Sequence, residues 1–228
     1  MKIILLKLVS ILYVLYNKNK NIILERNHLF LKANIKIDKK NHLKLTECHV
    51  NNFRLNISGN FNEILANNST ILNTNITIDG NNNSIILKNN SRFIGNIIVR
   101  GQGCKIEIGN NTTFGGVRIV NVGVNNDIII GNDCMFSDMI EIWASDTHTI
   151  FDKNNDQINP EKPIIIGNHV WVGSKTNILK GVTIGSNSII GMGSLVTKSV
   201  SNNTLSAGVP NKTLKNDVNW SINYKIKK

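Results

Sequence analysis

Aliphatic residues return at every sixth position in the second half of the chain, and small residues follow most of them four positions later. Neither a helix nor a single straight strand has this period. The chain must therefore turn a corner at fixed intervals, which predicts a triangular coil of short strands. Each aliphatic side chain would point inward and stack on its copy in the next coil, about 4.8 Å away. The aliphatic positions are Ile166, Val172, Ile178, Ile184, Ile190 and Val196, and the small ones are Val170, Thr176, Val182, Ser188 and Ser194.

Weaker copies of the repeat precede this run. They begin at Leu65, Leu87, Ile108 and Ile130, which are 22, 21 and 22 residues apart, and Leu45 opens a degenerate earlier copy. Each early coil is therefore predicted to contain about three hexads plus a few loop residues, with Gly or Asn at corners that need a positive φ. Such a solenoid needs only contacts between neighbouring coils and a cap at each end.

Composition and charge limit the number of domains and the kinds of partner that the chain can have. The chain has 228 residues, of which 41% are hydrophobic, so one domain with a substantial core is expected. A formal net charge of +11 favours anionic partners. The three cysteines are widely spaced, which indicates a reduced, cytoplasmic protein. The abundance of asparagine is interpreted as compositional and not as a sign of function. No basic run with interleaved aromatic residues occurs, so nucleic acid is not expected as a partner.

The first 20 residues form a short apolar run broken by Lys7. The run is too short to span a bilayer, which takes about 20 apolar residues. Leucines at helical spacing predict a short amphipathic helix that caps the fold or, alternatively, contacts an anionic membrane surface at the inner face. We therefore expect three parts: residues 1–44 as N-terminal segment and cap, residues 45–212 as solenoid, and residues 213–228 as C-terminal tail.

A family resemblance appears in the run IIGNHVWVGSKTNILKGVTIGSNSIIGMGSLVTKSV and the SAGVPNK that follows it. Both resemble the C-terminal signature of hexapeptide-repeat acyltransferases, and in particular of polysaccharide O-acetyltransferases. The resemblance covers residues 50–215. It implies an all-β fold, a left-handed parallel β-helix, with acetyl-CoA as donor and a homotrimer whose active sites lie between subunits. No set of histidine spacings resembles the metal-binding carbonic-anhydrase branch, so no metal is expected.

The repeat is interrupted between Ile130 and Ile166, where the spacing of 36 residues exceeds one repeat by about 14. The extra residues fall within 143–163, and a long loop on a rigid scaffold is a common location for function. This loop contains His148, our candidate general base, because an imidazole titrates near neutral pH. Its segment SDTHTI is similar to the one that carries the catalytic histidine in related O-acetyltransferases. A solvated loop histidine is the structural alternative.

Asp146 is the first candidate to orient the His148 ring, as a carboxylate does in a catalytic triad. Glu141, Asp152 and a backbone carbonyl are alternatives, and Asp146 could instead cap a turn of the loop. Trp171 is predicted to point outward, which is costly for a tryptophan unless it meets another group. The resemblance places Trp171 beside the active histidine; packing against the loop or a neighbouring subunit is the alternative.

The resemblance also implies a donor site along the late coils. Ser174 and the backbone around Met192 would line the pantetheine arm of acetyl-CoA, and lysines would meet its phosphates. The chain has Asn211 after the proline where relatives often have Ala or Cys. It has Lys215 where they often have Arg, which weakens the case for a bidentate contact there. The donor-site residues are Ser174, Met192, Thr197, Lys198, Lys212 and Lys215.

These observations predict a cytoplasmic O-acetyltransferase that acts on a sugar hydroxyl of a capsular or lipooligosaccharide-type glycan or its precursor. The acceptor could be acidic, with sialic acid as one such sugar. Direct attack on the thioester is expected, since no Cys or Ser has a recognisable base beside it. The alternatives are an N-acetyltransferase for an amino sugar and a non-catalytic solenoid that binds glycans.

Overall fold

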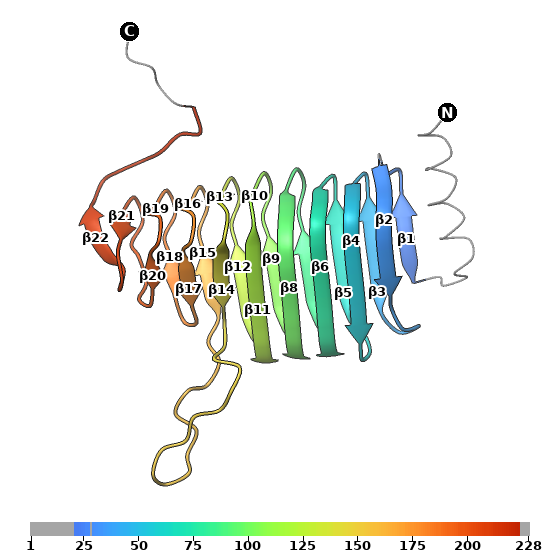
Figure 1. Ribbon diagram of the computed structural model, residues 1–228, viewed down its shortest axis with the longest axis horizontal. Coiled ribbons are helices and arrows are strands. Elements are labelled where there is room, and N and C mark those ends of the chain that lie inside the picture. Colours follow the sequence, from blue (N-terminus) through green and yellow to red (C-terminus); the bar gives the residue numbers. More distant parts are fainter. Residues whose placement is uncertain (1–20, 28, 224–228) are drawn as a thin grey trace.

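The computed structural model describes residues 21–27 and 29–223, and these residues wind into a single solenoid (Figure 1). They form 22 strands and no helix, and every strand pair is parallel except the last, β21 with β22. The predicted left-handed parallel β-helix is confirmed. The predicted amphipathic helix within residues 1–20, and with it the proposed membrane contact, lies outside the described residues.

Three flat faces make up each coil. The first face is an eight-stranded parallel sheet. Each of its strands is followed, around one corner, by the second face of the same coil. The strands of the first face are β1 (Ile22–Glu25), β3 (His42–Thr46), β5 (Glu63–Asn67), β7 (Ser84–Leu87), β9 (Lys105–Ile108), β12 (Asp127–Ile130), β15 (Ile164–Ile166) and β18 (Thr183–Ile184).

The second and third faces belong to one 14-stranded sheet, because in the early coils single long strands run across both faces. These strands are β2 (Leu29–Lys36), β4 (His49–Ser58), β6 (Thr70–Asn81) and β8 (Arg92–Gln102). In later coils the strand divides. The second face then contains β10 (Thr113–Phe114), β13 (Met135–Phe136), β16 (Trp171–Val172), β19 (Ile189–Ile190) and β21 (Leu205–Ala207), and the third contains β11 (Val117–Val124), β14 (Ile140–Trp143), β17 (Asn177–Leu179) and β20 (Leu195–Val196). Strand β22 (Lys212–Lys215) adds antiparallel to β21.

The interior has the side chains that the six-residue period predicts. All six aliphatic and all five small positions of the late hexads are buried. In the earlier coils a column of phenylalanines adds to them: the ring centroids of Phe93 and Phe114 are 5.2 Å apart, and those of Phe114 and Phe136 are 4.5 Å apart. Burial of these side chains provides the main free energy that holds coil on coil.

Asparagines stabilise the corners and part of the interior. Asn62 is buried, and its amide nitrogen donates to the side chain of Asn41 and to the carbonyl of Gly80, at 2.9 and 2.8 Å. Asn83 repeats the arrangement one coil later, at 2.9 Å from Asn62. Other asparagines adopt the positive φ that the corner between the first and second faces requires, which Asn tolerates better than most residues. These corner residues are Asn68, Asn90, Asn111, Asn187 and Asn203.

Two details of the predicted organisation are corrected. The solenoid begins at Ile22 rather than at residue 45, because β1 pairs with β3 and β2 pairs with β4 in register. Leu65 does not open a hexad: Ala66 is the residue that aligns with Leu87, and Leu65 is half-buried on the outer side of the strand. The early spacing is therefore 21, 21 and 22 residues.

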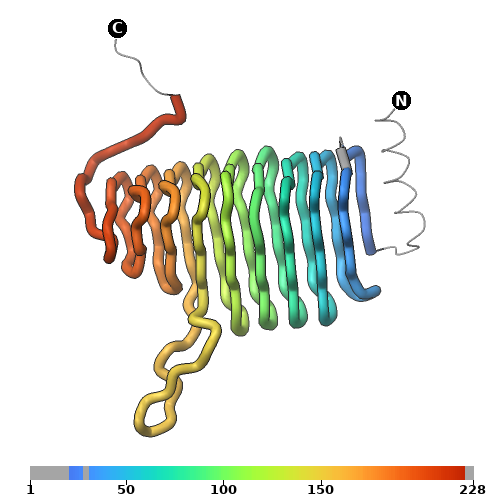
Figure 2. The backbone as a smooth tube through the Cα atoms, in the orientation of Figure 1, coloured from blue at the N-terminus to red at the C-terminus, as the bar shows by residue number. Residues whose placement is uncertain are grey.

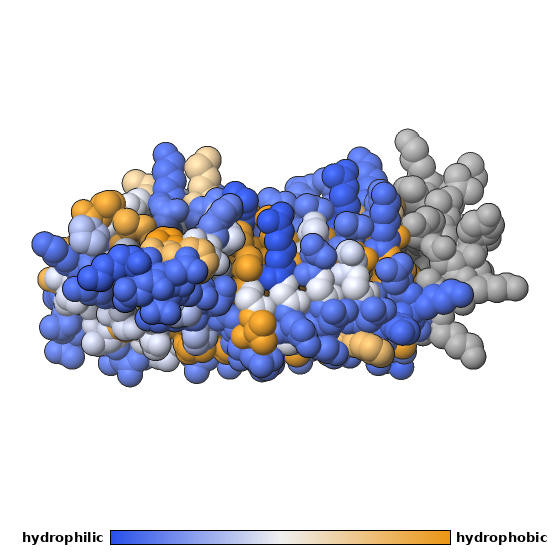
Figure 3. All heavy atoms as spheres, turned by 90° about the horizontal axis from the view of Figure 1, so that it is seen from below, coloured by the Kyte–Doolittle hydropathy of each residue, from blue (hydrophilic) through white to orange (hydrophobic). Residues whose placement is uncertain are grey.

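The interruption forms an arm, residues 144–163, between β14 and β15. The arm projects from the corner between the third and first faces (Figures 1 and 2). Its two legs are joined by a bridge between Phe151 and Gln157, and the Asp152 carboxylate accepts backbone hydrogen bonds that close the tip. The surface on this side is mostly hydrophilic, with hydrophobic side chains beside the arm (Figure 3). No helix long and apolar enough to cross a membrane occurs in the part of the chain that the structure describes.

Candidate active site

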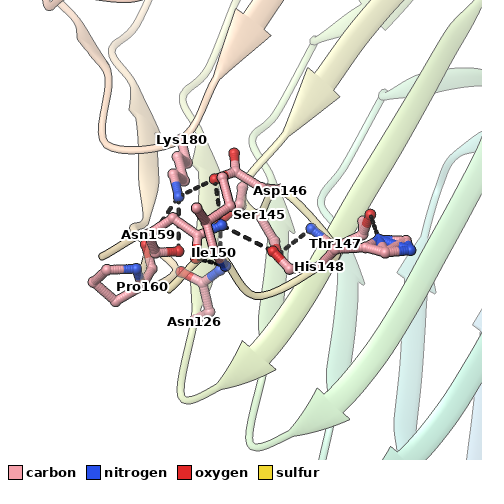
Figure 4. Close-up of polar contacts among 10 residues, drawn as sticks. Asn126, Ser145, Asp146, Thr147, His148, Ile150, Asn159, Pro160 and Lys180 are labelled. Carbon is pink, nitrogen blue, oxygen red and sulfur yellow. Dashed lines mark hydrogen bonds and ion pairs between the residues drawn. The ribbon is translucent and has the colours of Figure 1, made fainter. Parts of the chain in front are cut away.

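His148 lies at the base of the arm and is exposed (Figure 4). The chain leaves β14 through the buried residues Ala144 and Ser145, and the Ser145 hydroxyl accepts the backbone N–H of Thr147 at 2.9 Å. This turn directs the next side chain outward. The ring atom Nδ1 of His148 lies 3.2 Å from the Thr147 hydroxyl. Among the described residues, the other ring nitrogen, Nε2, has no hydrogen-bond partner.

Asp146 has a different role from the predicted one. Its carboxylate pairs with Lys180 at 2.6 Å and accepts from the side chain of Asn159 at 2.8 Å, whereas the His148 ring points away from this group (Figure 4). The hydrogen bond from Lys180 lowers the pKa of Asp146. Asn159 also donates to the backbone carbonyl of His148 at 2.8 Å. Asp146 is thus linked to the His148 backbone through Asn159, and it does not bond to the His148 ring.

The two rival carboxylates have other partners as well. Glu141 accepts a hydrogen bond from the indole nitrogen of Trp143 at 2.6 Å, and Asp152 closes the tip of the arm. Among the described residues, therefore, no carboxylate bonds to the His148 ring. The Thr147 hydroxyl takes the place that was predicted for a carboxylate.

Trp171 lies on the second face and is 37% exposed. His148 lies at the corner between the third and first faces, so a single protomer does not bring the two side chains together. Trp171 instead meets the C-terminal tail: the ring of Trp220 is 5.9 Å from that of Trp171. The predicted outward orientation of Trp171 is correct, but its contact within this chain is with neither the arm nor the histidine.

Trp220 packs beside Trp171, and sequence reasoning missed this contact. Its ring stacks on His169 with centroids 4.3 Å apart and planes at 8°, and its indole nitrogen donates to the His169 carbonyl at 2.8 Å. The sequence contains one sign of this contact. His169, with φ +54°, lies at the corner between the first and second faces, where most other coils have an asparagine. This departure marks where the tail docks on the solenoid.

The predicted donor residues fall into three groups. Ser174 and Met192 lie on the corner between the second and third faces, and Met192 is 74% exposed. The Ser174 hydroxyl donates to Asp138 and lowers the pKa of that carboxyl. Thr197 and Lys198 lie on the opposite corner, the one from which the arm projects. The third group is the pair of lysines on β22, at the end of the solenoid.

An outward-facing row on the second face connects Trp171 to the end of the solenoid. Trp171 aligns with Ile189, and Ile189 with Leu205 on successive parallel strands. Leu205 in turn aligns with Lys215 on β22, which also contains Lys212; both lysines are exposed. The row is a strip of apolar side chains that begins at Trp171 and ends at two cations.

Potential metal ligands and cysteine thiols are the other reactive groups of the chain. Among the described residues, no three His, Cys, Asp or Glu side chains gather in a way that could hold a metal ion. All three cysteines are free and buried. Burial raises the pKa of the Cys134 thiol to about 11 and also raises the pKa of Cys48 and Cys104. These thiols are therefore protonated at neutral pH and poor nucleophiles.

Known proteins resemble the chain at the level of both repeat and fold. A family model described as "Bacterial transferase hexapeptide (six repeats)" matches residues 163–198. The crystal structure of the polysialic-acid-specific acetyltransferase NeuO has a TM-score of 0.73 and 31% identity, over 88% of this chain and 92% of that one. The chain belongs to the hexapeptide-repeat acyltransferase family. The polysialic acid O-acetyltransferase OatWY is similar to it at 30% identity and a TM-score of 0.72, over 91% of this chain and 94% of that one.

Curated relatives of this hexapeptide-repeat acyltransferase match over shorter stretches. The polysialic acid O-acetyltransferase of Escherichia coli O1:K1 is 37% identical over 96 residues, which are 42% of this chain and 31% of the relative. The galactoside O-acetyltransferase of Escherichia coli K12 is 55% identical over 53 residues, 23% of this chain and 26% of the relative. The aligned part thus spans about a third or less of these relatives.

Proposed function

We propose that the protein is an acetyl-CoA-dependent O-acetyltransferase that acts on a sugar hydroxyl of a capsular or lipooligosaccharide-type glycan or its precursor, in the cytoplasm. The observation that carries the proposal is His148, an exposed imidazole at the base of the arm whose Nδ1 is engaged by Thr147. The relatives support the reaction class, since several are named as O-acetyltransferases of polysialic acid or galactosides.

In the proposed reaction, Nε2 of His148 removes the proton of a sugar hydroxyl as its oxygen attacks the thioester carbonyl. A carbon–oxygen bond forms, the carbon–sulfur bond breaks, and the leaving thiolate takes the proton back from the imidazolium. A positioned base contributes a factor of about 10²–10⁴ to the rate. Backbone N–H groups would stabilise the oxyanion. Direct transfer fits the buried, protonated cysteines, which leave no thiolate to carry the acetyl group.

The second face suits the donor. Its apolar row from Trp171 to Leu205 matches the uncharged pantetheine arm, and Lys212 and Lys215 at its end match the phosphates. Lys is a point-charge phosphate ligand. Thr197 and Lys198 lie on another corner of the same protomer, so contact between them and this donor would need a neighbouring subunit.

A homotrimer would complete the site. His148 and Trp171 lie on different faces of one chain, so adjacent solenoids are the direct way to bring them together. The arm offers a surface for such a contact, because three of its apolar side chains, Ile150, Phe151 and Ile158, are 51–59% exposed. Exposed apolar groups gathered on one element commonly mark a contact with another molecule.

The test is release of CoA thiol from acetyl-CoA with a panel of glycans. We expect acceptor-dependent release that falls about 10²–10⁴-fold in His148→Ala, with the fold retained. His49→Ala, a histidine in the distant early coils, is the matched control. Mixed refolding of His148→Ala with Trp171→Ala should restore part of the activity if adjacent subunits share the site. No release with any acceptor, together with no thermal shift by CoA, would overturn the enzyme proposal and leave a scaffold.

A further inference from the structure

A second feature lies beside His148 on the third face. A half-open pocket of about 150 Å³ lies there between the β-sheet and the base of the arm. Two arginines, Arg100 of β8 and Arg118 of β11, line it together with Trp143 and Thr147. The Thr147 hydroxyl contacts the His148 ring (Figure 4). Thr147 therefore lies between the pocket and the proposed base.

Arg118 is held in place by an aromatic ring. Its guanidinium carbon lies 5.0 Å from the centroid of the Trp143 ring, and the indole nitrogen of Trp143 donates to Glu141 at 2.6 Å. A guanidinium stacked on an aromatic face keeps its in-plane N–H groups available for a bidentate partner. The contact with Glu141 in turn fixes the indole. Arg118 is thereby presented in a defined orientation.

The two arginines have no salt-bridge partner among residues 21–27 and 29–223. Both are exposed. Each arginine has an acidic cross-strand neighbour, Glu141 for Arg118 and Asp79 for Arg100, but neither pair comes within salt-bridge distance, and one Glu141 oxygen accepts the Trp143 indole N–H. Aliphatic side chains, among them Ile98 and Val120, line the rest of the pocket. The combination suits a ligand with a carboxylate and a C–H surface, as an acidic sugar has.

We propose that this pocket binds a carboxylate of the acceptor glycan, and that Arg118 and Arg100 select acidic sugars of the sialic-acid or uronic-acid class. The inference rests on the proposed function of His148, because the pocket gains this meaning from the adjoining base. Carboxylate is favoured over a phosphate of CoA for a positional reason. The proposed donor row lies on the second face of the late coils, whereas the pocket lies on the third face of earlier ones.

The test uses the full chain and separates the two substrates. Arg118→Gln and Arg100→Gln should each raise the KM for oligosialic acid about tenfold or more, as expected for loss of a charged hydrogen bond. The KM for acetyl-CoA and the rate with a neutral galactoside should stay unchanged. Arg118→Lys should recover only part of the loss, since Lys lacks the planar fork. A glucuronic-acid oligosaccharide tests whether the carboxylate or the particular sugar is selected.

The matched control is Arg54→Gln. Arg54 lies in the same outward row of the third face, three strands from Arg118, and it does not line the pocket. Its substitution removes the same charge and should leave the acceptor KM unchanged. An equal rise in the acceptor KM for Arg54→Gln would show that overall positive surface charge attracts the acceptor. That result would overturn the proposal that the pocket binds its carboxylate. A rise in the acetyl-CoA KM alone would assign the arginines to a phosphate and overturn it as well.

Direct binding separates this inference from the proposed function. Titration of wild type and Arg118→Gln with oligosialic acid, without acetyl-CoA, requires no catalysis. Binding that depends on Arg118, without acetyl transfer to any glycan, would support carboxylate binding by the pocket and contradict the proposed acetyltransferase activity. Acetyl transfer to neutral glycans alone, with no binding of acidic ones, would support the acetyltransferase activity and contradict carboxylate binding by the pocket.

Discussion

The coils before the arm and the coils after it differ in width. Equivalent asparagines before the arm, such as Asn41, Asn62 and Asn83, are 21 residues apart, whereas after it Asn168 and its partner Ser186 are separated by 18. The extra residues lengthen the third face: β11 has eight residues and β17 has three. The narrowing is visible along the tube (Figure 2). The wide coils thus provide the surface for the arginine pocket, and the narrow coils provide the uninterrupted hexads of the proposed donor site.

The interiors of the two halves differ as well. The wide coils add a phenylalanine column and a buried asparagine ladder to the aliphatic stack. The narrow coils have small hydroxyl residues that bond to nearby backbone, as Thr176 does to the carbonyl of Gly173 at 2.7 Å. A wider triangle has more space to fill, and larger or polar side chains fill it. The difference therefore predicts where each half is most sensitive to substitution.

The largest effect should come from the aromatic column. Phe114 is fully buried between Phe93 and Phe136. Phe114→Ala removes packing on both sides and should lower the free energy of unfolding by about 3–5 kcal/mol. Urea denaturation measures the change, with Thr113→Ala, the half-exposed neighbour, as control. A loss below about 1 kcal/mol would mean that the wide coils do not depend on the column.

The asparagine ladder offers a sharper comparison. Asn62→Ala leaves the backbone N–H of Asn83 and the carbonyl of Gly80 without their side-chain partner. The Gly80 carbonyl is only part-buried, so at about 1–2 kcal/mol for each of these two groups we expect a total loss of about 2–4 kcal/mol. Asn67→Ala is the control, because its amide bonds to Asn89 in an exposed ladder. Equal losses in the two variants would contradict a role for burial.

The sequence predicted one half of the molecule better than the other. In the narrow coils six residues per face leave no freedom of register, and every predicted interior position is buried. In the wide coils the number of residues per coil changes between 21 and 22, so the spacing alone points to Leu65 at the interior position that Ala66 occupies. The asparagine content, interpreted from the sequence as a matter of composition, has a structural role. The amide can both donate and accept hydrogen bonds and so links successive coils.

For the candidate site, the sequence predicted the location of His148 on the arm but not the residues around it. The position of His148 followed from the interrupted repeat, because an insertion in a regular solenoid is visible in the spacing alone. Its partners did not follow, since Asp146 bonds to Lys180, a residue 34 positions further along the chain. Trp220 was missed for the same reason: its contact with His169 spans 51 positions. Contacts between a loop or tail and the solenoid have no period to reveal them.

Lys180 tests how the narrow half holds the arm. Its ammonium group donates to Asp146 and to the carbonyls of Asn159 and Pro160, at 2.6, 2.9 and 3.2 Å. Lys180→Met should change global stability by less than about 1 kcal/mol, because the pair is near the surface. It should nevertheless accelerate amide exchange in the arm and lower kcat several-fold, with the acetyl-CoA KM unchanged. Lys153→Met, at the exposed tip of the arm, is the control.

The pH dependence of this effect has a definite sign. Because the pKa of Asp146 is lowered by Lys180, the folded protein favours the charged carboxylate above the usual pKa of 3.8. The stabilising contribution is then fully present and is lost only as the pH falls through the lowered value. The difference in exchange protection between wild type and Lys180→Met should therefore be the same at pH 5 and pH 7. A difference that disappears between these two values would show that a group other than Asp146 anchors the arm.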